Sequence, residues 1–191
     1  FGRFTRSTMH LQAPSFTYTI VEPGLANASL TMGDDMFAEF SLPNVCNPLG
    51  DLLTGLMNMI VCPKHLWGEQ NVEHVIWYGE NEQYNWEIEM LEENRISVKV
   101  CQIDDFFGEE GVELLSFTCK FDELVLPIIR SLDEFIKRMG LLNYHQQWQK
   151  DEFPLTVFLF LKKYLIENGK WARKEPQGKD ILNDEILILL A

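Results

Sequence analysis

The sequence lacks the short signatures that mark known catalytic and nucleotide-binding sites. There is no G-x-S-x-G, no H-E-x-x-H and no glycine-rich phosphate loop, and the chain has only four histidines. His74 and His145 are candidates by residue type alone. Adjacent carboxylates such as Asp104 and Asp105 seldom converge on one ligand when they lie on a strand or loop. We therefore predict that the protein is not an enzyme and has no catalytic residues and no cofactor.

Cysteine is scarce, and its spacing excludes the common metal and redox motifs. The four cysteines, at positions 46, 62, 101 and 119, include no C-x-x-C pair, and each lies in an apolar or strand-like context. Cys62 with His65 supplies only half of a zinc site. This usage predicts reduced core cysteines in a cytoplasmic protein, and no bound metal.

Long apolar runs are also absent. No run reaches about 18 residues, so no membrane-spanning helix is expected, and residues 1–14 lack the apolar block of a secretion signal. The chain starts without Met, and we expect residues 1–8 to come from an expression vector. Residues 1–14 should lie outside the fold, residues 15–167 should form one domain, and residues 168–191 should form a polar linker and an apolar terminal segment.

Basic residues are scarce in the middle of the chain. The net charge is −13, from 29 acidic and 16 basic residues, and residues 34–121 contain 17 acidic and 4 basic residues. A field of this sign repels nucleic-acid phosphates and anionic lipid, and it speeds encounter with basic proteins. We expect a basic protein partner and neither nucleic-acid nor membrane binding. A solvated acidic face that keeps the protein in solution would explain the same charge.

Hydrophobic periodicity predicts the secondary structure. A period of two indicates strands at residues 16–20, 26–32 and 36–42, with turns at Gly24 and Gly33, and four further strands between residues 71 and 121. A helical period follows at residues 47–63, 122–139 and 153–165. We predict an α+β fold with a mainly antiparallel sheet of about six or seven strands and helices packed on one face.

Residues 47–63, NPLGDLLTGLMNMIVCP, allow three interpretations. Asn47 suits an N-cap, Pro48 suits the first helical position, and one apolar stripe follows. A phosphate loop would need more glycines and a Lys, and a membrane segment would need to be longer. A core helix is the prediction.

Five segments carry a resemblance to a known group of proteins. They are the strand at 36–42 running into NPLGDLLTGL, then VIWYGENEQYNWEIE, ISVKVCQIDD, the helix at 122–139 and GLLNYHQQWQKDEFP. Together they resemble a family of small acidic bacterial proteins that has no assigned activity, over roughly residues 36–165. This resemblance implies a fold unit and no catalytic residue. The layout is also similar, by analogy of design, to bacterial immunity proteins that neutralise toxins.

The main functional hypothesis is a cytoplasmic binding protein for a basic partner. Its concrete form is an immunity protein that neutralises a cationic toxin. Carboxylates on one sheet face would meet lysines and arginines, and an aromatic side chain would supply the buried anchor. The candidate partner-binding residues are Glu80, Glu82, Glu87, Glu89, Glu92, Glu93, Trp77, Tyr78 and Tyr84.

Two alternatives stay open. The first is a small-molecule-binding protein or enzyme with a pocket between sheet and helices, lined by Trp77, Trp86, Phe117 and Phe135, although aromatic residues are equally expected in a core. The second is a homo-oligomer joined through residues 153–165 and 181–190, which are the most apolar segments near the C-terminus.

Overall fold

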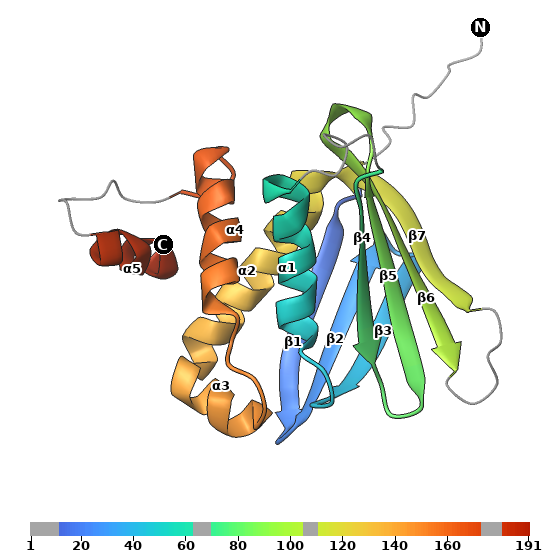
Figure 1. Cartoon of the computed structure of the whole chain (residues 1–191), viewed down its shortest axis with the longest axis horizontal. Coiled ribbons are helices and arrows are strands. Elements are labelled where there is room, and N and C mark those ends of the chain that lie inside the picture. Colours follow the sequence, from blue (N-terminus) through green and yellow to red (C-terminus); the bar gives the residue numbers. More distant parts are fainter. Residues whose placement is uncertain (1–11, 63–69, 105–110, 173–180) are drawn as a thin grey trace, which may run out of the picture.

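The structure confirms the predicted α+β class. It is a computed structural model that describes residues 12–62, 70–104, 111–172 and 181–191, with the side chains of residues 181–184 excepted. Seven strands form two antiparallel sheets, of three and four strands, and helices pack beside them (Figure 1). The predictions for residues 1–8 and for His65 fall outside the described residues.

The elements follow the predicted order closely. The strands are β1 (Pro14–Glu22), β2 (Leu25–Met32), β3 (Met36–Pro43), β4 (Val72–Tyr78), β5 (Glu82–Met90), β6 (Arg95–Asp104) and β7 (Val112–Lys120). The helices are α1 (Pro48–Val61), α2 (Phe121–Met139), α3 (Leu141–Trp148), α4 (Leu155–Glu167) and α5 (Ile181–Leu190).

The first sheet is the meander β1-β2-β3, and its turns depend on glycine. Gly24 and Gly33 adopt φ values of 77° and 68°, a left-handed conformation that a residue with a Cβ rarely takes. The register places Tyr18, Ala28 and Phe40 side by side on the inner face, where all three are buried. The alternation of apolar and polar residues in the sequence therefore becomes one dry face and one wet face.

The second sheet is the meander β4-β5-β6-β7, and it has the same two-sided character. Its inner face carries rows such as Val75, Trp86, Val100 and Leu115, which are directly opposite one another and buried. The two sheets meet where β3 lies beside β7, and Phe40 packs against the rings of Trp77, Tyr84 and Trp86 at centroid distances of 5.1, 5.0 and 5.4 Å. The aromatic side chains of β4 and β5 are thus part of the shared core.

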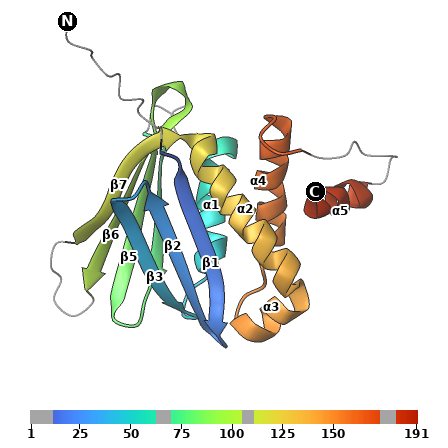
Figure 2. The ribbon, with the colours of Figure 1, turned by 180° about the vertical axis from the view of Figure 1, so that it is seen from behind.

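Helices α1 and α2 each pack on the sheet that does not immediately precede them in the sequence. Helix α1 follows the first sheet in sequence but packs on β4 of the second, and α2 follows the second sheet but packs on β1 of the first. Figures 1 and 2 show both helices on one side of the strands, with α1 beside β4 and α2 beside β1. The inner faces are therefore covered by helices, and the outer faces of both sheets remain open.

Helix α1 begins as the sequence predicts. The side chain of Asn47 accepts a hydrogen bond from the backbone N–H of Gly50 at 3.0 Å, and Pro48 occupies the first turn. Its apolar stripe is buried against β4 and α4. The prediction of a core helix is confirmed.

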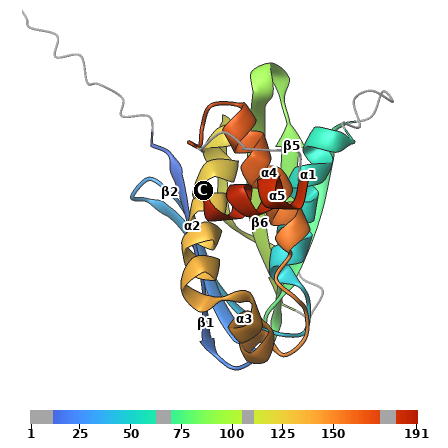
Figure 3. The same cartoon turned by 90° about the vertical axis from the view of Figure 1, so that its left-hand side faces the viewer.

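The C-terminal helices pack on one another within the same chain. Helix α4 contacts α1, α2 and α5, and α5 lies across α4 on the side away from α1 (Figures 1 and 3). Ile188 of α5 is buried, whereas Ile186 and Leu190 are exposed. These contacts bury much of the apolar surface of residues 153–165 within one chain. The homo-oligomer stays a prediction.

Two features differ from the sequence prediction in detail. Phe121, which falls inside the segment 71–121 predicted to form strands, is the first residue of α2, because β7 runs into the helix without a loop. Residues 141–148, for which no helix was predicted, form the short helix α3 between Gly140 and Gln149, both of which have positive φ values.

Candidate functional site

The candidate site is the outer face of the second sheet, which none of the described helices covers (Figure 1). The register sets its side chains in rows across β4, β5, β6 and β7. We call this surface the outer β4–β7 face; its members include His74, Ile76, Tyr78, Gln83, Asn85, Glu87, Glu89, Ser97, Lys99, Cys101, Ile103, Glu113, Ser116 and Thr118.

The strands bring Glu87 and Glu89 onto this face together with basic residues. Glu87 lies directly between His74 of β4 and Lys99 of β6. The Nζ atom of Lys99 is 3.9 Å from Glu113 Oε2, and both side chains are about half exposed, so this ion pair contributes little stability. The centre of the face is therefore mixed in charge rather than purely acidic.

The other predicted glutamates separate into two groups. Glu80 and Glu82 lie at the turn between β4 and β5, and Glu92 and Glu93 lie in the 3-10 turn after β5. Nine residues of β5 lie between these ends, a distance on the order of 30 Å at about 3.3 Å per residue. One small partner group cannot contact both ends at once.

The end of the sheet near Glu82 concentrates negative charge. Glu82 of β5 is directly opposite Asp104 of β6, and two like charges in register repel each other unless a cation lies between them. Glu82 Oε1 accepts a hydrogen bond from the Tyr84 hydroxyl at 2.7 Å, and Oε2 accepts one from the Asn81 N–H at 3.0 Å. Burial, and then the adjacent Glu82, raise the pKa of Tyr84, so the phenol remains a donor.

Of the three predicted aromatic anchors, Tyr78 is the one that is exposed. Trp77 is fully buried and its indole Nε1 donates to the Pro48 carbonyl at 2.9 Å, which fixes the start of α1 on β4. Tyr84 is also buried. Tyr78 has 40% of its surface exposed and lies beyond exposed Ile76 on the same strand face.

A depression of 350 Å³ lies near the centre of the outer β4–β7 face. Its polar lining comes from His74, Asn85, Glu87, Lys99 and Cys101. His74 and Cys101 lie on strands that are separated by β5, so they do not form a nucleophile–base pair in direct contact. The depression offers polar contacts and no recognisable catalytic arrangement.

The remaining catalytic candidates do not converge. His145 Nδ1 is 2.7 Å from Glu152 Oε1, but both side chains are largely exposed. Burial raises the pKa of Cys119 to about 12, which removes it as a nucleophile at neutral pH. All four cysteines are free thiols. Within the described residues, no group of three or more His, Cys, Asp or Glu side chains could hold a metal ion.

The aromatic residues of the alternative pocket are core residues. Trp77, Trp86, Phe117 and Phe135 are all buried. The rings of Trp77 and Trp86 lie 4.7 Å apart and Phe135 packs edge-on against Tyr18 at 5.4 Å. Their role in the structure is packing between the sheets and the helices.

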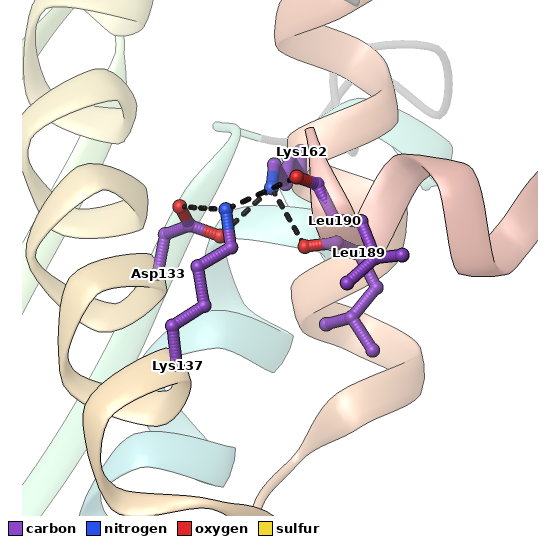
Figure 4. Close-up of polar contacts among 5 residues, drawn as sticks. All are labelled: Asp133, Lys137, Lys162, Leu189 and Leu190. Carbon is purple, nitrogen blue, oxygen red and sulfur yellow. Dashed lines mark hydrogen bonds and ion pairs between the residues drawn. The ribbon is translucent and has the colours of Figure 1, made fainter.

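One buried charged cluster was missed by sequence reasoning. Lys162 of α4 is completely buried, and its Nζ lies 2.7 Å from Asp133 Oδ1 of α2 and 3.2 Å from the Leu189 carbonyl of α5 (Figure 4). Lys137 Nζ lies 2.9 Å from the other oxygen of Asp133 and donates to the Leu190 carbonyl at 3.4 Å. The two lysines therefore bind the C-terminal carbonyls of α5, where cations are favoured.

Comparisons of the chain with protein-family models, curated proteins and solved structures found no match. The resemblance to small acidic bacterial proteins therefore stays a prediction. Within the described part of the chain, no helix combines the length and the apolar character needed to cross a membrane.

Proposed function

We propose that the protein is a non-enzymatic cytoplasmic binding protein that engages a basic protein partner through the acidic end of its second sheet. A bacterial immunity protein that neutralises a cationic toxin is its concrete form. The observation that carries the proposal is the acidic end of the second sheet, where Glu82 and Asp104 are in register close to Glu80. The alternation of β5 places Glu82 on the Tyr84 side of the sheet, opposite Glu87 and Glu89.

A basic partner fits this end for a physical reason. Two opposed carboxylates on neighbouring strands destabilise the free protein, and a lysine or arginine placed between them would relieve that repulsion. Exposed Tyr78 lies at the same end of the sheet on the neighbouring strand, directly opposite Gln83, and supplies the amphipathic aromatic group that interfaces favour as an anchor for a partner that covers this end. Glu87 and Glu89 lie on the other side of β5 and are outside this contact.

The test begins with co-purification of the protein with the products of adjacent genes. For each candidate partner, the association rate is then measured at about 50 mM and about 500 mM salt, where the Debye length falls severalfold. We expect the rate to fall by about tenfold or more, because exposed carboxylates steer the encounter. A partner that binds with no salt dependence would contradict the electrostatic mechanism.

Charge-neutral variants locate the contact. Glu82→Gln and Asp104→Asn should each slow association at low salt, and Tyr78→Ala should mainly raise the dissociation rate. Glu134→Gln is the matched control, because Glu134 is an exposed carboxylate on α2, away from the sheet face. Equal effects of Glu82→Gln and Glu134→Gln would show that net charge, and not this surface, determines binding.

A further inference from the structure

The outer face of the first sheet is a second open surface, with a different chemistry. The registers of β1, β2 and β3 set six polar residues in two adjacent rows across this face. One row is Thr17, Ser29 and Glu39, and the next is Thr19, Asn27 and Ser41. Both rows face away from the core, since the alternate residues of the same strands are buried.

These two rows border a depression of 420 Å³. Its remaining wall includes Tyr84 of β5, so the depression lies where the first sheet meets the second and is not a flat stretch of one sheet. Its volume lies in the lower part of the range of small-molecule sites, about 300–1,000 Å³. The position and size suit one small ligand or the end of a longer one.

The lining is polar but almost without charge. Among the described residues that line it, Glu39 is the only acid or base apart from the Tyr84 phenol, and none is Lys, Arg or His. These residues offer no cation to neutralise an anion, and their many hydroxyl and amide groups would be left without partners by a purely apolar ligand. A single carboxylate among nine lining residues provides at most one contact for a cationic group, so a neutral polar molecule matches most of the wall.

The hydrogen-bonding capacity of the wall points to hydroxyl groups on the ligand. Each Ser and Thr hydroxyl and the Asn27 amide both donate and accept. The Thr17 and Ser29 hydroxyls lie 2.6 Å apart, and this bond uses one donor and one acceptor, so the pair keeps one donor and further lone pairs for a ligand. A ligand hydroxyl likewise donates and accepts, so it matches such partners in either direction.

An exposed aromatic side chain lies outside the depression, in the row next to Thr17, Ser29 and Glu39, where Phe37 is directly opposite Thr31. Phe37 is two residues before Glu39 on the same face of β3, and 62% of its surface is exposed. An exposed phenyl ring packs well against the C–H face of a pyranose ring, where weak C–H contacts add to apolar burial. We infer that the depression between β1–β3 and Tyr84 binds a neutral saccharide, with Phe37 as the stacking platform; this inference does not depend on the proposed function.

The inference is tested by two-dimensional amide NMR of the full chain titrated with three neutral probes, namely maltotetraose, cellotetraose and tetra-N-acetylchitotetraose. We expect at least one probe to shift the amides of β1, β2 and β3 around Asn27 and Glu39, with saturation in the millimolar range, about 1–10 mM. Asn27→Ala, Glu39→Gln and Phe37→Ala should each weaken that binding by about threefold to tenfold, equivalent to the loss of one hydrogen bond or stacking contact.

A matched control separates the site from general surface effects. Ser29→Ala removes a hydroxyl from the depression, and Ser116→Ala removes an exposed hydroxyl from the outer β4–β7 face, so only the first should weaken binding. All these side chains are on the surface, and the amide spectrum of each variant reports whether it is folded. No saturable shift with any probe, or equal effects of the two serine variants, would overturn the inference. Preference for an anionic sugar such as glucose 6-phosphate would overturn the charge argument.

Discussion

The buried Asp133–Lys162 pair leads to an asymmetric mutational prediction. Asp133→Leu leaves the Lys162 ammonium buried without a carboxylate among its described contacts, which are then the Leu189 carbonyl at 3.2 Å and the rings of Trp171 at 4.8 Å and Phe158 at 6.0 Å. Removing one member of a buried ion pair costs about 3–5 kcal/mol of unfolding free energy. A loss of this size is a large share of the total stability of about 5–15 kcal/mol for a domain.

The reverse substitution is expected to cost less. Lys162→Met leaves Asp133 paired with Lys137 at 2.9 Å, and Lys137 is 38% exposed, so the remaining charge is still compensated. We expect the free energy of unfolding to fall by about 1–3 kcal/mol, because Asp133 and the Leu189 carbonyl lose the hydrogen bonds that Lys162 donates. Burial lowers the pKa of Lys162 against the opposing effect of Asp133, which also indicates that its charge is costly to bury.

The double variant Asp133→Leu with Lys162→Met completes the cycle. In the double variant both buried charges are gone, and two apolar side chains of similar volume face each other. We expect its free energy of unfolding to be no more than about 1 kcal/mol below that of Lys162→Met alone, or to exceed that value. The assay is urea-induced unfolding followed by circular dichroism, with equal m-values as the check for two-state behaviour. Additive single-variant losses, or a smaller loss for Asp133→Leu than for Lys162→Met, would refute the reasoning.

Three further predictions concern local contacts and pH. Asn47→Ala removes the N-cap of α1 and should lower the free energy of unfolding by about 1 kcal/mol in the same urea assay, whereas Asn47→Ser should retain most of it. In a thiol-reagent titration at pH 8, exposed Cys62 should react at once and Cys119 only after unfolding, because burial raises the Cys119 pKa to about 12; simultaneous reaction would contradict its placement. Burial raises the pKa of Tyr144 and Tyr164, so the folded state keeps protons that the unfolded state releases near pH 10, and stability should fall as pH rises above about 10. During an alkaline titration, the phenolate absorbance of Tyr144 and Tyr164 should therefore appear only when the protein unfolds. Full ionisation of all tyrosines near pH 10 in the folded protein would contradict this prediction.

Local features of this fold could be predicted from the sequence because they depend on neighbouring residues. The alternation of apolar and polar residues predicted the strands, and the Asn47–Pro48 pair predicted the start of α1. The division of the strands into two sheets, and the packing of α1 on β4, depend on contacts between residues far apart in the chain. The strand pattern alone does not distinguish these arrangements from one continuous sheet.

The candidate site shows the same division. The alternation in β5 already places Tyr84 on the buried side with Trp86, and the length of β5 already separates Glu82 from Glu92. The presence of Lys99 beside Glu87 requires the register between β5 and β6, which the sequence does not specify. Lys162 lies on the buried stripe of α4 with Phe158, Leu161 and Leu165, whereas Lys163 pairs with exposed Glu167. The sequence of α4 does not show that Asp133 of α2 compensates the buried charge, because that contact joins residues far apart in the chain.

The crossing of α1 and α2 between the sheets has a consequence for synthesis on the ribosome. When residues up to Val61 have emerged, α1 has no β4 to cover its apolar stripe, and β1 has no α2. The apolar surface of the early nascent chain therefore stays exposed until α2 has been translated. We expect an N-terminal fragment that ends after α1 to depend on chaperones rather than fold alone.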